Sequence, residues 1–158
     1  MTTARQIAWL EGAVGAAMIL GALAFQYIGH YPPCEMCHWQ RWPHIAAAAI
    51  GLGGMILIGA GVLPARAAAG IAILATVCVA VSGGLGVYHA GVEWHLWKGP
   101  TACTTGFQFN GGTLDLNARV PMCDRAAWRL FGISLAGYNA AISLAAAAFG
   151  AIQLGRKR

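Results

Sequence analysis

Charged residues are scarce in this sequence. They make up only 9% of its 158 residues, and only five are acidic, whereas about a quarter of a soluble domain is charged. Because 58% of the residues are hydrophobic, the chain has too few polar side chains to cover a water-soluble core, which excludes a soluble globular protein. The sequence also lacks an internal repeat, a low-complexity linker and a basic nucleic-acid-binding patch. We therefore expect a single domain over residues 1–158 and no nucleic-acid partner.

What the sequence does contain is four long apolar runs, at approximately residues 7–29, 45–63, 67–88 and 130–154. Each is close to the ~20 residues that a helix needs to cross a bilayer, whereas membrane-spanning strands are shorter and alternate in polarity. The first run is long for a signal peptide and continues past its A-L-A at 22–24, so we expect it to remain as a span. Glycine and alanine recur in all four runs and allow close helix packing. The sequence predicts an all-α membrane protein, a four-helix transmembrane bundle.

Four spans place both chain ends on one side of the membrane and two loops on the other. Basic residues are denser on the side of the chain ends, which includes the terminal GRKR, so we expect that side to be cytoplasmic. The two loops then face an oxidising compartment, where disulfides persist. These loops contain four of the five cysteines, namely Cys34, Cys37, Cys103 and Cys123. Arg125 and Arg129 are candidates to bind anionic membrane lipid headgroups.

The first loop contains "PPCEMCHWQRWPH", residues 32–44. The proline pair favours a helix start at Cys34, where unsatisfied N–H groups would lower the pKa of a thiol and raise its reactivity. Helical spacing places Cys34, Cys37, Arg41 and His44 on one stripe. Arg41 is one turn beyond Cys37, where its charge can stabilise a thiolate or the oxygen of an electron acceptor. We predict a redox dithiol with Arg41 and His44 beside an acceptor-binding site.

Two other interpretations of the Cys-x-x-Cys pair are weaker. As a structural disulfide it closes a very short loop, which stabilises a fold little in the chain-entropy picture. As a zinc site it needs a second close cysteine pair, but Cys103 and Cys123 are far apart in the sequence. We therefore favour redox chemistry and expect no bound metal.

The second loop, residues 98–123, is rich in glycine and proline, which argues against a continuous helix and favours an accessible segment. We expect Cys103 to be within reach of a protein partner. Asp124 is a good N-cap for a helix starting at "RAAWRLFG", which would place Cys123 just before a helix start. The segment "FQFNGGTLDL" is either a small hairpin or a strip on the membrane surface. Two cysteine pairs on one side suggest an electron relay by thiol–disulfide exchange, although a Cys103–Cys123 staple remains possible.

The chain resembles the DsbB family of bacterial inner-membrane disulfide-forming oxidoreductases. The resemblance runs from "AFQYIGHYPPCEMCHWQRWPH" through "YHAGVEWHLWKGPTAC" to "PMCDRAAWRLFGISLAGYNA". It implies that a DsbA-like periplasmic thiol oxidase attacks Cys103, the disulfide partner of Cys123, and that electrons pass on to Cys34 and Cys37. It further implies that Cys37, beside Arg41, meets ubiquinone or menaquinone. The implied role is disulfide bond formation in exported proteins, with both loops periplasmic.

"YHAGVEWHLW" departs from the best-known members of this family. His89 and Glu93 stand four residues apart at the end of the third apolar run. Quinone reduction consumes protons, and ionisable residues near the membrane are candidates for supplying them. A structural hydrogen-bonded pair at a helix end is the alternative.

Three rival functions remain to be compared. A haem or metal membrane protein would use His44 and His89 as ligands. A structural subunit would contain inert disulfides. An enzyme of the vitamin K epoxide reductase type would have a different cysteine arrangement, and "PCEMCHWQR" argues against it.

Overall fold

The computed structural model describes residues 2–104 and 122–156 of the chain. The predicted hairpin or surface strip "FQFNGGTLDL" lies outside these residues. Four helical segments in the described part are long and apolar enough to cross a membrane. They are α1 (Thr3–Tyr27), the segment Glu35–Gly59, the segment Ala65–Glu93 and α6 (Leu135–Gly155). The predicted four-helix transmembrane bundle is therefore confirmed.

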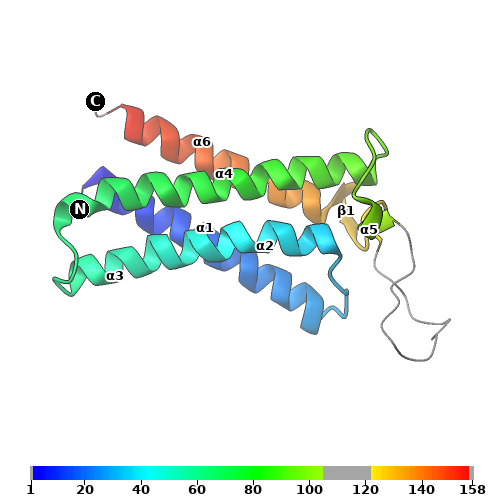
Figure 1. The fold of residues 1–158 in the computed structure, drawn as a ribbon, viewed down its shortest axis with the longest axis horizontal. Helices are drawn as coiled ribbons and strands as arrows, with labels where there is room; N and C mark the ends of the chain where they lie inside the picture. The colour runs from blue at the N-terminus through cyan, green and yellow to red at the C-terminus, as the bar shows by residue number, and fades with distance from the viewer. Residues whose placement is uncertain (1, 105–121, 157–158) are drawn as a thin grey trace.

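The second and third spans are each composed of more than one helix. The second contains α2 (Glu35–Ala48), the π-helix η1 (Ala49–Gly53) and α3 (Gly54–Gly59). The third contains the short 3₁₀-helix η2 (Ala65–Ala67) and α4 (Ala68–Glu93). Figure 1 shows that α1 begins and α6 ends at one end of the bundle, whereas the short helix α5 (Thr101–Thr104) and β1 (Arg129–Leu130) lie at the opposite end.

The second span begins at Glu35, earlier than the apolar run near residue 45 indicated. Cys34 caps this helix, since its Sγ accepts a hydrogen bond from the Cys37 N–H at 3.2 Å. The helix then continues through Pro43. The first turns of α2 contain polar residues, so hydropathy alone places the start of the span too late in the sequence. As a result, the Cys-x-x-Cys pair lies on the spanning helix itself.

Small residues allow the helices to approach closely, as the composition predicted. A Cβ atom added at Gly51 of η1 would lie 2.5 Å from the Ala8 carbonyl oxygen of α1. One added at Gly86 of α4 would lie 2.9 Å from the Ala140 nitrogen of α6. Such distances are shorter than van der Waals contact, so these positions require glycine. Without a hydrophobic driving force between helices in lipid, this close packing holds the bundle together.

Gly51→Ala should destabilise the bundle by about 1–3 kcal/mol, because the added methyl group forces α1 and η1 apart. Gly53→Ala is the matched control: it lies in the same π-helix, and a Cβ added there meets nothing within 4 Å. Thermal unfolding in detergent, followed by circular dichroism, measures the difference. Equal midpoints for the two variants would show that the Gly51 contact is unimportant.

A short hairpin precedes α6, in place of the helix predicted to start after Asp124. Strands β1 and β2 (Ile133–Ser134) pair antiparallel around Phe131 and Gly132. These two residues have φ values of 50° and 80°, as a tight two-residue hairpin turn requires. The N-cap of the last span is Ser134, whose Oγ accepts a hydrogen bond from the Gly137 N–H at 3.2 Å. The prediction of Asp124 as a helix cap is therefore wrong.

Candidate active site

Cys34 and Cys37 lie at the start of α2 as free thiols, with their sulfur atoms 2.7 Å apart. Cys34 is buried. Hydrogen bonding to the Cys37 sulfur, and then burial, raise the pKa of the Cys34 thiol. The predicted lowering of this pKa at the helix N-terminus is therefore wrong, although the capping N–H contact is present. The two sulfur atoms are within hydrogen-bonding distance of each other.

Cys103 and Cys123 form a disulfide, with their Cα atoms 5.4 Å apart. Cys103 lies on α5, and the Cys123 N–H donates to its carbonyl oxygen at 3.1 Å. Both side chains are buried, Cys103 at 6% exposure and Cys123 at 0%, against Cys34, Met36 and Val92. The expectation of an accessible Cys103 is wrong for this state of the protein, because the α5 turn packs the disulfide onto the start of α2.

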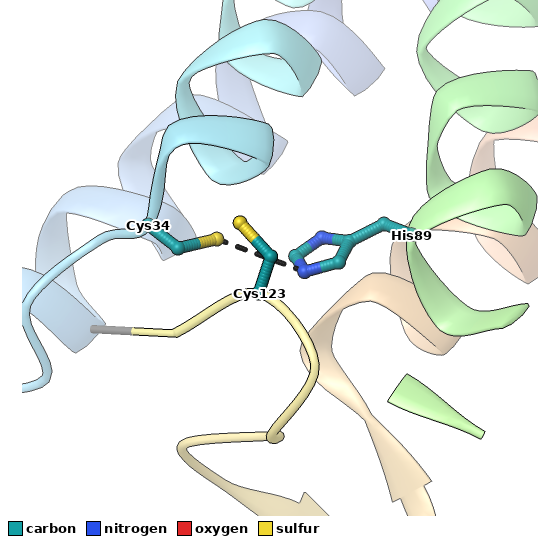
Figure 2. A group of neighbouring side chains, drawn as sticks. All are labelled: Cys34, His89 and Cys123. Carbon is teal, nitrogen blue, oxygen red and sulfur yellow. Dashed lines mark hydrogen bonds between the residues drawn. The ribbon is translucent and has the colours of Figure 1, made fainter. Parts of the chain in front are cut away.

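The two cysteine pairs meet beside His89. The Cys34 Sγ, the Cys123 Sγ and a ring nitrogen of His89 all lie within 4.8 Å of one another. Figure 2 shows the three side chains pointing toward one another from α2, from α4 and from the chain that follows the undescribed segment. Thiol–disulfide exchange requires a sulfur to approach a disulfide sulfur, and Cys123 is placed to do this with Cys34.

His89 and Glu93, the ionisable pair noted at the end of α4, both lie at this site. The His89 Nε2 is 3.6 Å from the Cys34 Sγ and 3.7 Å from the Glu93 Oε1. The His89 Nδ1 is 2.8 Å from the Gln40 side-chain nitrogen. Both members of the pair are buried. His89 is therefore in contact with Cys34 as well as with Glu93.

A cavity of about 870 Å³ opens beside the dithiol. Its polar lining contains the predicted stripe and pair, namely Cys34, Cys37, Arg41, His44, His89 and Glu93. Its apolar lining includes Met18, Ile19, Ala22, Phe25 and Trp128. The Arg41 guanidinium is held at the cavity wall by donating to the Gln26 Oε1 at 2.7 Å. Cys34 and Cys37 line the cavity, whereas Cys103 and Cys123 do not, although Met122 next to Cys123 does.

Sequence reasoning missed the polar residues that support the site from within the bundle. The Asn139 Nδ2 donates to the Gln40 Oε1 at 2.7 Å, and the Ser82 Oγ donates to the Gln40 carbonyl oxygen at 2.8 Å. None of these three residues is among the candidates that the sequence offered. Their polar character inside apolar runs was the available signal, since polar groups in a membrane interior need partners and are commonly functional.

The fold and the site together define a multi-pass membrane protein with two adjacent cysteine pairs and an apolar cavity. The chain matches the model of the family described as "Disulfide bond formation protein DsbB" over residues 4–153 and belongs to this family. No curated protein and no solved structure matches the chain. Family membership implies disulfide-forming oxidoreductase activity.

Proposed function

We propose that this protein is a thiol:quinone oxidoreductase that reoxidises a DsbA-like thiol oxidase. The observation that carries the proposal is the contact between three features: the Cys103–Cys123 disulfide, the Cys34–Cys37 dithiol packed against it, and a ligand-sized cavity that this dithiol lines. Electrons entering at the disulfide can pass through the dithiol to an acceptor in the cavity. We propose Cys34, Cys37, Cys103 and Cys123 as the catalytic residues.

The proximity of the Cys34 and Cys123 sulfur atoms supports the following electron route, in which the attack on Cys103 is what the family resemblance implies. The partner's thiolate attacks Cys103, and its second thiol resolves the mixed disulfide, which leaves the partner oxidised and Cys103 and Cys123 as thiols. The Cys123 thiolate then attacks Cys34 of the oxidised Cys34–Cys37 pair and releases Cys37 as a thiolate. Cys103 attacks Cys123, re-forms their disulfide and releases Cys34. The structure corresponds to the state after this step, with one disulfide and one dithiol.

The cavity suits a quinone as the final acceptor. Its volume of about 870 Å³ lies within the usual range for small-molecule sites, and its apolar wall suits a lipid-soluble ring. A bound ubiquinone or menaquinone would accept two electrons and two protons, and the Cys34–Cys37 disulfide would re-form. Cys37, Arg41 and His44 would bind it, with His89 and Glu93 at the same wall.

We propose an orientation with cytoplasmic chain ends and both cysteine-containing loops in the periplasm of a bacterial inner membrane. The cysteine pairs lie at the end of the bundle opposite to the start of α1 and the end of α6, which supports this arrangement (Figure 1). Disulfide chemistry also requires an oxidising compartment at that end.

The haem or metal alternative is less consistent with the histidine contacts. Both ring nitrogens of His89 face protein groups, the Gln40 amide nitrogen and the Cys34 sulfur. A ligand histidine needs a free lone pair on the nitrogen that faces the metal. The structural-subunit alternative is tested by measuring turnover, because a structural subunit would not catalyse repeated quinone reduction.

The decisive experiment follows quinone absorbance without oxygen, after the purified protein is mixed with a reduced DsbA-like protein and a soluble ubiquinone analogue. We expect quinone loss that stops when either cysteine pair is removed. Cys78→Ser is the matched control, because Cys78 is a free cysteine of α4 outside the proposed route. If no quinone is lost with intact cysteines, across several partners and quinones, the proposed oxidoreductase function is wrong and the disulfides are structural.

Arg41→Met should raise the apparent KM for quinone roughly tenfold to hundredfold, because it removes a charged hydrogen-bond donor from the cavity wall. The maximal rate should change less, since the four cysteines remain in place. Arg66→Met, at the opposite end of the bundle, is the charge-matched control. An unchanged KM in Arg41→Met would remove Arg41 from the quinone site.

A further inference from the structure

A chain of buried polar side chains leads from the first turns of α6 to the cysteine pairs. Its first member, Asn139 of α6, has its Nδ2 3.1 Å from the Ser82 carbonyl oxygen. A main-chain carbonyl can only accept, so the Asn139 atom facing it must be the donating nitrogen. The Asn139 Oδ1 then faces the other way and accepts from the Ser143 hydroxyl at 2.8 Å. The orientation of this amide is therefore fixed by its surroundings.

The second member, Gln40 of α2, is fixed in the same way. Its Nε2 donates to the Met36 carbonyl oxygen at 3.0 Å, again an atom that can only accept. Its Oε1 accepts from the Asn139 Nδ2 at 2.7 Å. Two separate carbonyl groups, of Ser82 and Met36, thus require the same direction of donation along the chain. Reversing either amide would place an oxygen atom against a carbonyl oxygen.

The third member is His89. Its Nδ1 lies 2.8 Å from the Gln40 Nε2, which is an N–H donor, so Nδ1 must be the acceptor and carry no proton. A neutral imidazole has one N–H, which is then on Nε2. The Nε2 atom faces the Cys34 Sγ at 3.6 Å and the Glu93 Oε1 at 3.7 Å. Both atoms can accept a hydrogen bond from it, and the main chain of Cys123 also hydrogen-bonds with the His89 ring.

We propose that Gln40 and Asn139 are positioning residues that hold His89 as its Nε2–H tautomer, so that His89 acts as a hydrogen-bond donor to the Cys34 sulfur. The tautomer follows from the contacts alone, whereas its effect on catalysis rests on the proposed function. When Cys103 attacks Cys123, the Cys34–Cys123 bond breaks, the Cys103–Cys123 bond forms, and the electron pair leaves on Cys34. The His89 N–H stabilises the negative sulfur as it departs.

The same geometry decides against two other roles for His89. Cys34, His89 and Cys123 together resemble the ligand set of a soft metal ion (Figure 2). A metal-ligating histidine normally donates its second ring N–H to a carboxylate or carbonyl, whereas here that nitrogen receives an N–H from Gln40. For the same reason the neutral ring offers the sulfur atoms a proton donor and no lone pair, so it is not the base for a Cys34 thiol.

The test is the tautomer itself, read by NMR of the full-length protein with nitrogen-15-labelled histidine in detergent. The His89 signals are assigned by their loss in His89→Gln. We expect a protonated Nε2 and an unprotonated Nδ1 in the wild type. A proton on Nδ1, alone or together with one on Nε2, would overturn the proposal.

Gln40→Glu tests whether Gln40 is responsible. A carboxylate has no N–H to donate and accepts one instead, so the single proton of the neutral His89 ring should move from Nε2 to Nδ1. Gln6→Glu, an exposed residue near the start of α1, makes the same chemical change and should leave the spectrum unaltered. Gln40→Met is the second variant, for use if Gln40→Glu does not fold. It removes the donor without adding charge, so His89 should become a mixture of the two tautomers. A His89 that keeps the wild-type tautomer in these variants would contradict the role of Gln40.

These spectra require neither a partner nor a quinone, so their outcome is independent of the proposed function. Turnover supplies the second readout. In Gln40→Glu the maximal rate of partner oxidation should fall on the order of tenfold, as expected for losing one hydrogen bond to a charged group. The KM for the partner should not change, because Cys103 lies outside the amide chain. A raised KM with an unchanged maximal rate would contradict a role at Cys34.

Discussion

Cys37→Ser is expected to abolish quinone reduction while the protein still oxidises one equivalent of its partner. Cys37 lines the cavity, and without its sulfur the Cys34–Cys37 disulfide cannot re-form. Removing a covalently acting residue commonly lowers turnover by about 1,000-fold or more. The Cys103–Cys123 disulfide does not depend on Cys37, so it should accept two electrons once from the reduced partner.

Two measurements made on the same sample separate these effects. Quinone absorbance should remain constant, and acid quenching followed by thiol counting should show one oxidised partner for each enzyme molecule. Cys78→Ser should behave as the wild type in both assays. Quinone turnover at the wild-type rate in Cys37→Ser would remove Cys37 from the electron route, and a complete lack of partner oxidation would remove Cys103–Cys123 as the entry point.

Cys103→Ser and Cys123→Ser should both lose partner-dependent turnover, but they should differ in the disulfide that remains. In Cys103→Ser the Cys123 thiol is free beside Cys34, since their sulfur atoms lie within 4.8 Å. It should attack the oxidised Cys34–Cys37 pair, form a Cys34–Cys123 disulfide and release the Cys37 thiol. No external oxidant is needed, because one disulfide is exchanged for another. Cys123→Ser has no sulfur in this position and should retain the Cys34–Cys37 disulfide.

Peptide mapping by mass spectrometry without reduction distinguishes the two outcomes. The Cys34–Cys123 link is expected in Cys103→Ser, and a Cys34–Cys103 link is not expected in Cys123→Ser. Finding the second link would mean that Cys103, and not Cys123, transfers electrons between the pairs. Finding neither link would show that the two pairs do not exchange directly, against the arrangement in Figure 2.

Much of the fold was predictable because its signals are local. Membrane-spanning helices follow from runs of apolar residues, and the alignment of Cys34, Cys37, Arg41 and His44 follows from helical spacing. All four residues line one cavity, as that spacing indicated. The boundaries were less predictable: α2 includes polar turns that hydropathy does not detect, and α6 starts at Ser134 because a hairpin turn at Phe131 and Gly132 replaces a helical turn.

The accessibility of Cys103 shows where sequence reasoning failed. Glycine and proline around it indicate irregular chain, and irregular chain is usually exposed. Here the disulfide packs on Met36 and Val92, so the short α5 turn is covered. Burial of this kind depends on which distant parts of the chain pack against a residue, and the residues flanking Cys103 carry no signal of that packing.

The sequence by itself determined a four-helix membrane bundle with a Cys-x-x-Cys pair and Arg41 on one helical stripe before the second apolar run, because hydropathy and helical periodicity act over neighbouring residues. Only the tertiary structure decided that Cys123 faces Cys34 and that Asn139 directs the Gln40 amide toward His89. These contacts join residues 89 and 99 positions apart, counted from Cys34 to Cys123 and from Gln40 to Asn139 in the sequence. They arise from the packing of separate helices, since each buried polar group in a membrane interior needs a partner that only another helix can supply.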